Sequence, residues 1–248
     1  MKKVTAIVLH HLNQNQGYLD LCLDAMSKQE GVDLEVLVMA SCPEVPEFKD
    51  FKGLKVTMIP NNYSTAKATN EGAKIARPDS EYLWLCNDDI IPAKSAARIM
   101  AQTVSVEPVI LNPVCPTENG FYFRWNLEIG GKIMPRFNTL EDVSSEMVDD
   151  ILEAQMPSIQ FPIPFNCFHA TMMRRDLFDK VGGIDERYRN QQEDKDFCWT
   201  AMKHHNASCW ITTGAFVFHF GGVSAKYTIT DAMREQGVQT LNEKWGNA

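Results

Sequence analysis

The chain has no C-x-x-C pair, no long apolar run and no excess of positive charge, and each absence removes a class of protein. Its seven cysteines are odd in number and lie far apart, which argues against a disulfide framework and against a zinc knuckle. The longest uncharged stretch, residues 154–173, holds three prolines together with Asn166 and His169, so it is no membrane span. We therefore expect a soluble, cytoplasmic protein without a membrane span.

The formal net charge of the 248 residues is −8, so no field over the whole protein would attract nucleic acid or an anionic membrane. A local basic patch stays possible. The apolar stretch 4–9 ends at His10 and His11, too early for the apolar region of a signal peptide, and it is better interpreted as a first strand. Without a linker, a repeat or a low-complexity segment, the chain is predicted to form one globular domain with an insertion.

Apolar runs alternate with helical patterns over the first hundred residues. Strands are predicted at 4–9, 34–39, 55–59 and 82–86, and helices at 18–29 and 65–76, the second capped by Ser64. This alternation indicates a parallel sheet with helices on both sides.

The pattern changes after Pro92, which suits the first turn of a helix running to about Val104. Beyond it, the pair Gly130-Gly131 separates two strand-like runs and predicts a hairpin. Residues 141–153 are typical of an acidic surface helix. The Pro-rich stretch that ends at Pro164 cannot be a central strand, so we expect a loop there.

Asp88 and Asp89 come directly after the apolar run 82–86. Such a run is typical of a strand buried on both faces, and ligands gather beyond the carboxyl ends of parallel strands. The two carboxylates are therefore expected where a metal and a phosphate would meet. A polar turn that simply ends the strand is an equally good interpretation, because Asn and Asp are common turn residues.

A second acidic cluster opens the helix predicted to run through about His205. Helical geometry places Asp194 on the apolar face and Glu193 at its edge, whereas Asp196 is expected to face solvent. Helix capping alone would explain acidic residues here. An ionisable group on an apolar face needs a partner or a function, which favours a catalytic role for Asp194. Burial would raise its pKa and the helix terminus would lower it, so the direction stays open.

The run 215–220 is apolar except for His219, which leads into the pair Gly221-Gly222. A histidine in a strand is commonly a structural residue. Here the glycine turn could approach phosphates closely, and Lys226 just beyond could offset their charge. His219 is therefore a candidate ligand.

Taken in order, these motifs resemble those of the family 2 glycosyltransferases with the GT-A fold, over about residues 4–227. The first strand with Asn13 resembles the family's nucleotide-binding start. Asn70-Glu71-Gly72 resembles the family's N-x-G motif, and Asn87-Asp88-Asp89 resembles its D-x-D motif. Residues 182–186, followed by Glu193-Asp194, resemble its G-G-x-D-E motif and E-D pair. His219, with Gly222 and Ser224, resembles its late histidine and phosphate loop.

The resemblance implies an α/β, GT-A fold: a Rossmann-like, mostly parallel sheet with helices on both faces and an inserted hairpin and helix for the acceptor. It implies a single glycosyltransferase domain over residues 1–248. Residues 1–112 would form its nucleotide-sugar-binding half, and residues 113–248 its acceptor and catalytic half.

The resemblance also implies metal-dependent inverting transfer of a sugar from a nucleotide diphosphate donor. Asp194 would be the general base with Glu193 beside it, and Asp89 and His219 would hold a divalent cation on the diphosphate. Mn²⁺ suits a site with an imidazole better than Mg²⁺ does. The implied donor contacts are His11, Asn13, Asn61, Lys67, Asn70, Asn87, Asp88, Gly222, Ser224 and Lys226, with Asn87 reaching ribose or a metal-bound water.

One departure from the family concerns the base. The second strand runs into Ala40-Ser41-Cys42, where the family commonly has an Asp that reads the base. UDP is favoured as the family's commonest nucleotide, and dTDP and GDP stay open.

The acceptor is expected to be a hydroxyl of a glycan or glycoconjugate. Near it we expect residues 165–169, which precede the Arg174-Arg175-Asp176 turn where the family places acceptor contacts. The aromatic face of Phe121, Phe123 and Trp125 could also contact the acceptor, although such a strand is more often packing. One alternative is the hydroxymethylated DNA base used by small phage glycosyltransferases, although the acidic charge argues against DNA. The others are a sugar nucleotidyltransferase, which would need an amino-terminal Gly-rich loop, and a silent nucleotide-sugar-binding protein. The sequence does not indicate an oligomeric state.

Overall fold

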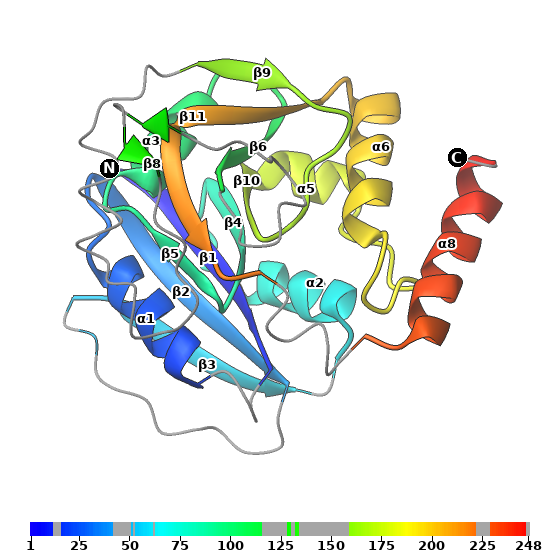
Figure 1. Ribbon diagram of the computed structural model, residues 1–248, viewed down its shortest axis with the longest axis horizontal. Coiled ribbons are helices and arrows are strands. Elements are labelled where there is room, and N and C mark those ends of the chain that lie inside the picture. The colour runs from blue at the N-terminus through cyan, green and yellow to red at the C-terminus, as the bar shows by residue number, and fades with distance from the viewer. Residues whose placement is uncertain are drawn as a thin grey trace.

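The structure is a computed structural model that describes residues 1–11, 16–41, 51, 53–61, 63–115, 128–129, 132–133, 159–221 and 229–246. Its centre is a nine-stranded sheet (Figure 1) in the order β3-β2-β1-β4-β10-β6-β11-β5, with β9 beside β11. The strands are β1 (Lys2–His10), β2 (Val32–Ser41), β3 (Lys55–Asn61), β4 (Tyr82–Asn87), β5 (Ile90–Pro92), β6 (Val109–Val114), β9 (Gln160–Pro162), β10 (Ala170–Arg174) and β11 (Ser208–His219). The helices are α1 (Gln16–Ser27), α2 (Thr65–Ile75), α3 (Ala96–Thr103), α5 (Arg175–Val181), α6 (Glu193–His205) and α8 (Asp231–Trp245).

The first half of the sheet is parallel, as the sequence predicts. β1 pairs in parallel with β2 and β4, and β2 pairs in parallel with β3, so the carboxyl ends of these four strands share one edge. The predicted cap of α2 is also confirmed, because Ser64 Oγ accepts a hydrogen bond from Lys67 N at 3.3 Å.

The second half of the sheet is mixed. β10 lies antiparallel between β4 and β6, and β6 pairs in parallel with β11. β5 pairs antiparallel with the end of β11, which sets His219 opposite Ile90. The helix predicted from Pro92 is therefore wrong at its start. Residues 90–92 find a strand partner, Pro92 is tolerated because β5 is an edge strand, and α3 begins only at Ala96.

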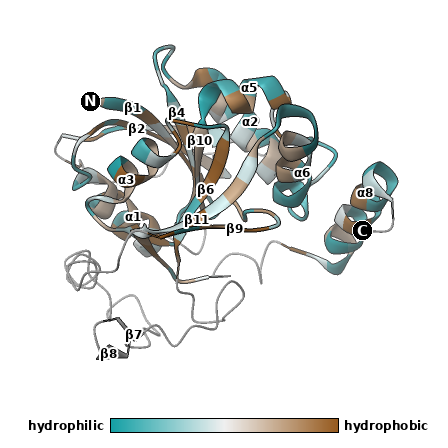
Figure 2. Cartoon of the chain, turned by 90° about the horizontal axis from the view of Figure 1, so that it is seen from above, coloured by the Kyte–Doolittle hydropathy of each residue, from teal (hydrophilic) through white to brown (hydrophobic). Residues whose placement is uncertain are grey.

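Helices cover both faces of this sheet. α1 and α3 pack on one face, while α2, α5 and α6 pack on the other (Figure 1). Alternate side chains of β1 enter the two cores, with Val8 on the first face and Ile7 on the second. Figure 2 shows hydrophobic residues along the strands between the two helical layers. Because both faces are covered, β4 is buried along almost its whole length, which explains its continuous apolar run.

Four further predictions fall in the second half. β7 (Glu128–Ile129) and β8 (Lys132–Ile133) pair antiparallel around Gly130-Gly131, as expected for the hairpin. Where it is described, from residue 159 on, the Pro-rich stretch contributes the short strand β9, which is not central. The predicted helix 141–153 and the aromatic run 121–125 lie outside the described residues. Within the described ranges, none of the helices combines the length and apolar character needed to cross a bilayer.

Candidate active site at the carboxyl edge of the sheet

Asp89 and His219 meet at the carboxyl edge of the sheet. His219 Nε2 lies 3.0 Å from Asp89 Oδ1, and both residues are buried. The pairing of β5 with β11 brings them together, because Asp89 immediately precedes β5 and His219 ends β11. Phe220 N also donates to the carbonyl oxygen of Asp89 at 3.1 Å. Residues 130 positions apart in sequence thus form one ion pair.

Three other side chains surround His219. Asn87 Nδ2 lies 3.3 Å from His219 Nε2, and the Cys115 side chain hydrogen-bonds to the imidazole. The ring of His169 stacks on the ring of His219, with centroids 5.1 Å apart and planes 5° from parallel. Sequence reasoning missed Cys115, which belongs to no recognisable motif, and expected His169 only among residues 165–169 near the acceptor.

The pKa values indicate which side chains of this cluster are charged. Burial lowers the pKa of His219, but the Asp89 carboxylate outweighs burial and raises it to about 10. Burial would raise the pKa of Asp89, and the His219 charge instead holds it below its usual value. Burial and the charge of His219 lower the pKa of His169 to about 3. The stacked pair therefore contains one charged and one neutral imidazole near neutral pH.

The donor set of Asp89 and His219 fits a cation shared with a substrate. In the part of the chain that the structure describes, no three His, Cys, Asp or Glu side chains form a complete metal site. A carboxylate and an imidazole supply two ligands, and diphosphate oxygens and water can supply the others, as is usual for cations bound through substrate phosphates. A cation would have to replace the proton that His219 shares with Asp89.

His10 and Asp88 form a second buried pair beside this cluster. His10 Nδ1 lies 2.6 Å from Asp88 Oδ2, and the two side chains are 0% and 4% exposed. His10 Nε2 is buried and has no hydrogen-bond partner among the residues that the structure describes. Asp88, expected to contact the donor, is thus held on one side by a histidine that sequence reasoning treated only as the end of a strand.

Asp194 points inward from the first turn of α6, as the helical geometry predicts. Burial raises the pKa of its carboxyl group, although hydrogen bonds from the Cys167 side chain and from Lys195 N, at 2.7 Å, act in the opposite direction. Burial and the neighbouring Asp194 carboxylate raise the pKa of Glu193 to about 8. Among the described residues, the Glu193 Oε2 atom is buried without a hydrogen-bond partner. Because the pKa values of both carboxyl groups are raised, the coupled pair retains a proton at higher pH than two exposed carboxylates would.

A short segment connects the two carboxylate clusters. Cys167 contacts Asp194, and His169, only two residues later, stacks on His219. Two residues of chain span at most about 7 Å between Cα atoms. The three distant stretches that carry Asp89, Asp194 and His219 therefore converge on one side of the molecule.

Asn70 joins two motifs that lie far apart in sequence. Its Nδ2 donates to the carbonyl oxygen of Ile184 at 2.8 Å, and its Oδ1 accepts from Ile184 N at 2.8 Å. Gly183 has a φ of 79°, and a Cβ there would lie 2.7 Å from Asn70 Oδ1, so a side chain would clash. The amide thus holds α2 against the turn that leads to α6.

The other expected donor residues are distributed as follows. His11 is exposed, and the Lys67 Nζ atom lies over the Tyr63 ring at 4.4 Å. Asn61 ends β3, but its side chain is outside the described part. Asn13, Gly222, Ser224 and Lys226 also lie outside the described residues.

The prediction that Asp196 faces solvent is wrong. Asp196 is 2% exposed, because α8 packs over that side of α6. A single-helix projection cannot anticipate a second helix that arrives from the end of the chain.

Comparison with known proteins decides the family. The model of Glycosyl transferase family 2 matches residues 6–182, well over half of the chain. The chain belongs to glycosyl transferase family 2. The match includes the stretch with Asn87, Asp88 and Asp89, but it ends before Asp194 and His219.

Solved structures confirm the GT-A fold of this family 2 glycosyltransferase. The structure titled GalNAc-T7 with UDP, GalNAc and Mn²⁺ is 11% identical, with a TM-score of 0.63 over 98% of this chain and 48% of that chain. TarS of S. aureus is 16% identical, with a TM-score of 0.54 over 97% of this chain and 40% of that chain. The chain thus spans less than half the length of either. No curated protein matches it.

Proposed function

We propose that this family 2 glycosyltransferase moves a sugar from a nucleotide diphosphate donor to an acceptor hydroxyl, with inversion and with the help of a divalent cation. The observation that carries this proposal is the convergence of the Asp89–His219 pair and the Glu193–Asp194 pair through residues 167–169. A leaving diphosphate needs positive charge, and an attacking hydroxyl needs a base, so the two pairs match the two demands.

Asp194 is the proposed general base. Its carboxylate accepts the proton of the acceptor hydroxyl while the oxygen bonds to the anomeric carbon. The bond from that carbon to the diphosphate oxygen breaks, and the electron pair leaves with the phosphate. A raised pKa makes the Asp194 carboxylate a stronger base than that of an exposed Asp.

Asp89 and His219 are the proposed cation ligands. The bound cation would neutralise the charge that develops on the leaving diphosphate. Mn²⁺ is favoured over Mg²⁺ because one of the two ligands is an imidazole. The GalNAc-T7 structure contains UDP and Mn²⁺, which makes this pair the first to test. His10 holds Asp88 beside the site, and Asn87 is proposed to reach ribose or a cation-bound water.

The two halves proposed for this single domain would bind different substrates. Residues 1–112 would bind the nucleotide sugar and supply Asp89, and residues 113–248 would bind the acceptor and supply Asp194 and His219. A reducing, cytoplasmic setting is proposed from the cysteines, because all those described are free thiols.

Calorimetry with UDP, dTDP and GDP, each with and without Mn²⁺ or Mg²⁺, tests the donor and the cation together. We expect Mn²⁺-dependent binding of one nucleotide, with UDP first. Binding that does not change on adding either cation would remove the metal from the proposal.

Product analysis identifies the acceptor. Mass spectrometry of glycan extracts and of hydroxymethylated DNA, after incubation with the matching nucleotide sugar, should show a mass increase of one sugar in the glycan fraction. Modification of the DNA alone would replace the proposed glycan acceptor with a DNA base.

A further inference from the structure

The C-terminal helix α8 lies on the outer side of α6 (Figure 1, Figure 2) and hydrogen-bonds to its first turn. Trp245 Nε1 donates to Asp196 Oδ1 at 2.7 Å, and Lys244 Nζ donates to Asp196 Oδ2 at 2.8 Å. The Trp245 ring also packs edge-on against Trp199, with centroids 5.6 Å apart. Because both oxygens of a buried carboxylate bind donors from one helix, α8 determines where Asp196 lies.

The N-cap residue of α6 does not cap the helix. Gln192 has a φ of 70° and makes no side-chain hydrogen bond to the first turn, where Asp194 Oδ1 accepts from Lys195 N at 2.7 Å. A left-handed φ is uncommon outside glycine, and an N-cap side chain ordinarily fixes the start of a helix. The contacts from α8 supply the restraint that a cap would ordinarily provide.

α8 also contacts the residues just before α6. A Cβ at Gly237 would lie 2.6 Å from the carbonyl oxygen of Gln191, so the helix can approach this closely only with glycine there. Gln236 Nε2 lies 3.4 Å from the carbonyl oxygen of Arg187, which accepts its hydrogen bond. The helix therefore touches the chain on both sides of Glu193 and Asp194.

We propose that Asp196, Lys244 and Trp245 form a clamp that positions Asp194 for catalysis. The inference rests on the proposed function, because it takes Asp194 as the general base. Asp194 and Asp196 lie two residues apart in one helical turn, so a rotation of that turn moves both carboxylates. A shift of about 1 Å in a reacting group can cost on the order of 100-fold in rate. The three residues of the clamp are positioning residues and act through Asp194.

The test compares kinetic constants per folded molecule in Trp245→Phe and Lys244→Met. Trp245→Phe removes one hydrogen bond and keeps an aromatic ring, and Lys244→Met removes the charge and keeps a long side chain. We expect kcat to fall about tenfold in each, with the KM for the nucleotide sugar within about twofold of the wild type. Lys244→Arg should restore most of the lost kcat, because it restores a charged donor.

Trp210→Phe is the matched control, because Trp210 Nε1 donates to Ser208 Oγ at 2.6 Å within β11, away from α6. Its kcat should stay at the wild-type value. The double variant Asp196→Asn, Lys244→Met keeps the test usable if the single variants unfold, since it removes the buried charge together with its partner. The double variant should also show the lower kcat.

Two outcomes separate the clamp from the chemistry that it serves. Unchanged kcat in every clamp variant that folds, the double variant included, would overturn the clamp if Asp194→Asn is inactive. A fully active Asp194→Asn would instead overturn the proposed base.

Discussion

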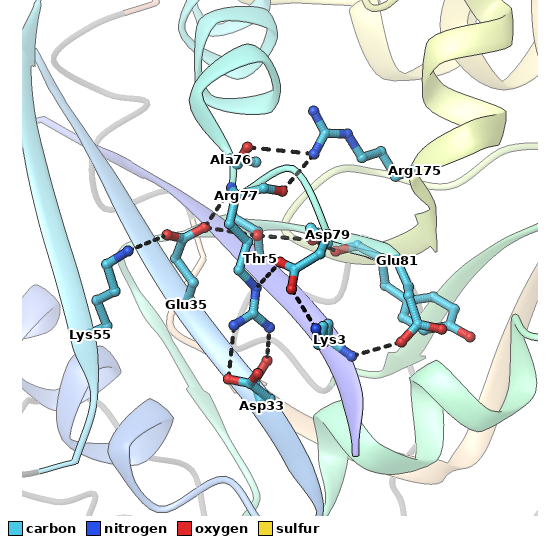
Figure 3. A network of polar contacts seen from close by, with 12 residues as sticks. Lys3, Thr5, Asp33, Glu35, Lys55, Ala76, Arg77, Asp79, Glu81 and Arg175 are labelled. Carbon is cyan, nitrogen blue, oxygen red and sulfur yellow. Dashed lines mark hydrogen bonds and ion pairs between the residues drawn. The ribbon is translucent and has the colours of Figure 1, made fainter.

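The parallel half of the sheet has an amino edge, where its strands begin, and a carboxyl edge, where they end. The two differ in how completely their buried charged groups are hydrogen-bonded. At the amino edge (Figure 3), the buried Glu35 accepts hydrogen bonds from Thr5 Oγ1 at 3.1 Å, Lys55 Nζ at 3.1 Å and Arg77 N at 3.0 Å. Burial acts to raise its pKa, and these donors together hold it below its usual value. The carboxylate is fully compensated, so this edge contributes stability.

Two arginines make further polar contacts at the amino edge. Arg77 Nη1 donates to Asp33 Oδ1 at 2.8 Å, and its Nε, which makes no hydrogen bond, still lies 3.6 Å from Asp79. Arg175 Nη1 donates to the carbonyl oxygens of Ala76 and Arg77 near the end of α2, at 3.5 and 2.8 Å (Figure 3). These bonds satisfy carbonyl groups that a helix end leaves without partners.

The carboxyl edge keeps groups that are incompletely satisfied. His10 Nε2 and Glu193 Oε2 are buried without hydrogen-bond partners in the described part of the chain. Glu193 and Asp194 also place two carboxyl groups side by side, which raises the pKa of Glu193. Buried polar groups are normally satisfied, and exceptions concentrate where a ligand binds. The comparison teaches that one edge holds the fold together while the other is arranged for a substrate.

The largest effect that we expect is on catalysis at the carboxyl edge. Asp194→Asn should lower kcat by about 10²–10⁴-fold and leave donor binding nearly intact, because the base acts in the transition state. Initial rates and donor calorimetry on the same preparation measure both. Asp24→Asn, on α1 in the partly exposed i,i+4 pair with Lys28, is the control and should keep full activity.

The next effect concerns the cation. His219→Ala should weaken Mn²⁺-dependent donor binding by at least about tenfold, because it removes one of two protein ligands. Calorimetry with Mn²⁺ measures it, and the exposed His204, replaced by Ala, controls for loss of a histidine. An unchanged affinity in His219→Ala would make the imidazole a structural residue.

The amino edge should respond in stability alone. Glu35→Ala leaves the Arg77 N–H without its acceptor, so the free energy of unfolding should fall by about 2 kcal/mol. Denaturant unfolding measures this loss, and kcat per folded molecule should not change. Asp179→Ala, whose side chain is 61% exposed in its pair with Arg175, should change stability by less than about 0.5 kcal/mol. A lower kcat in Glu35→Ala would contradict the inference that the amino edge affects stability alone.

The last effect is on the pH dependence of stability. The pKa of Glu193 is raised from 4.5 to about 8 in the folded protein, so folding favours its protonated form. Its contribution is fully present below the unfolded pKa and is lost as pH rises through about 8. Glu193→Gln should therefore flatten the decline of Tm between pH 5 and pH 9. An identical slope in both proteins would show that Glu193 ionises freely.

Much of the first half of the fold could be predicted from local patterns. The strands up to β4, the helices α1 and α2 and the Ser64 cap all follow from periodicity and capping rules that involve neighbouring residues. The inward direction of Asp194 also follows, because helical geometry alone decides it. Asp196 shows the limit of that method, since its projection was correct for one helix and wrong once α8 was present.

By itself, the sequence determined the parallel half of the sheet and the acidic residues that end β4 and open α6, because those features depend on short-range periodicity. Only the tertiary structure decided that β5 pairs with β11, which places His219 on Asp89, and that α8 buries Asp196. It also decided which carboxylates are satisfied at one edge and left incomplete at the other. Contacts between distant segments have no local signal, because they arise only when the whole chain packs.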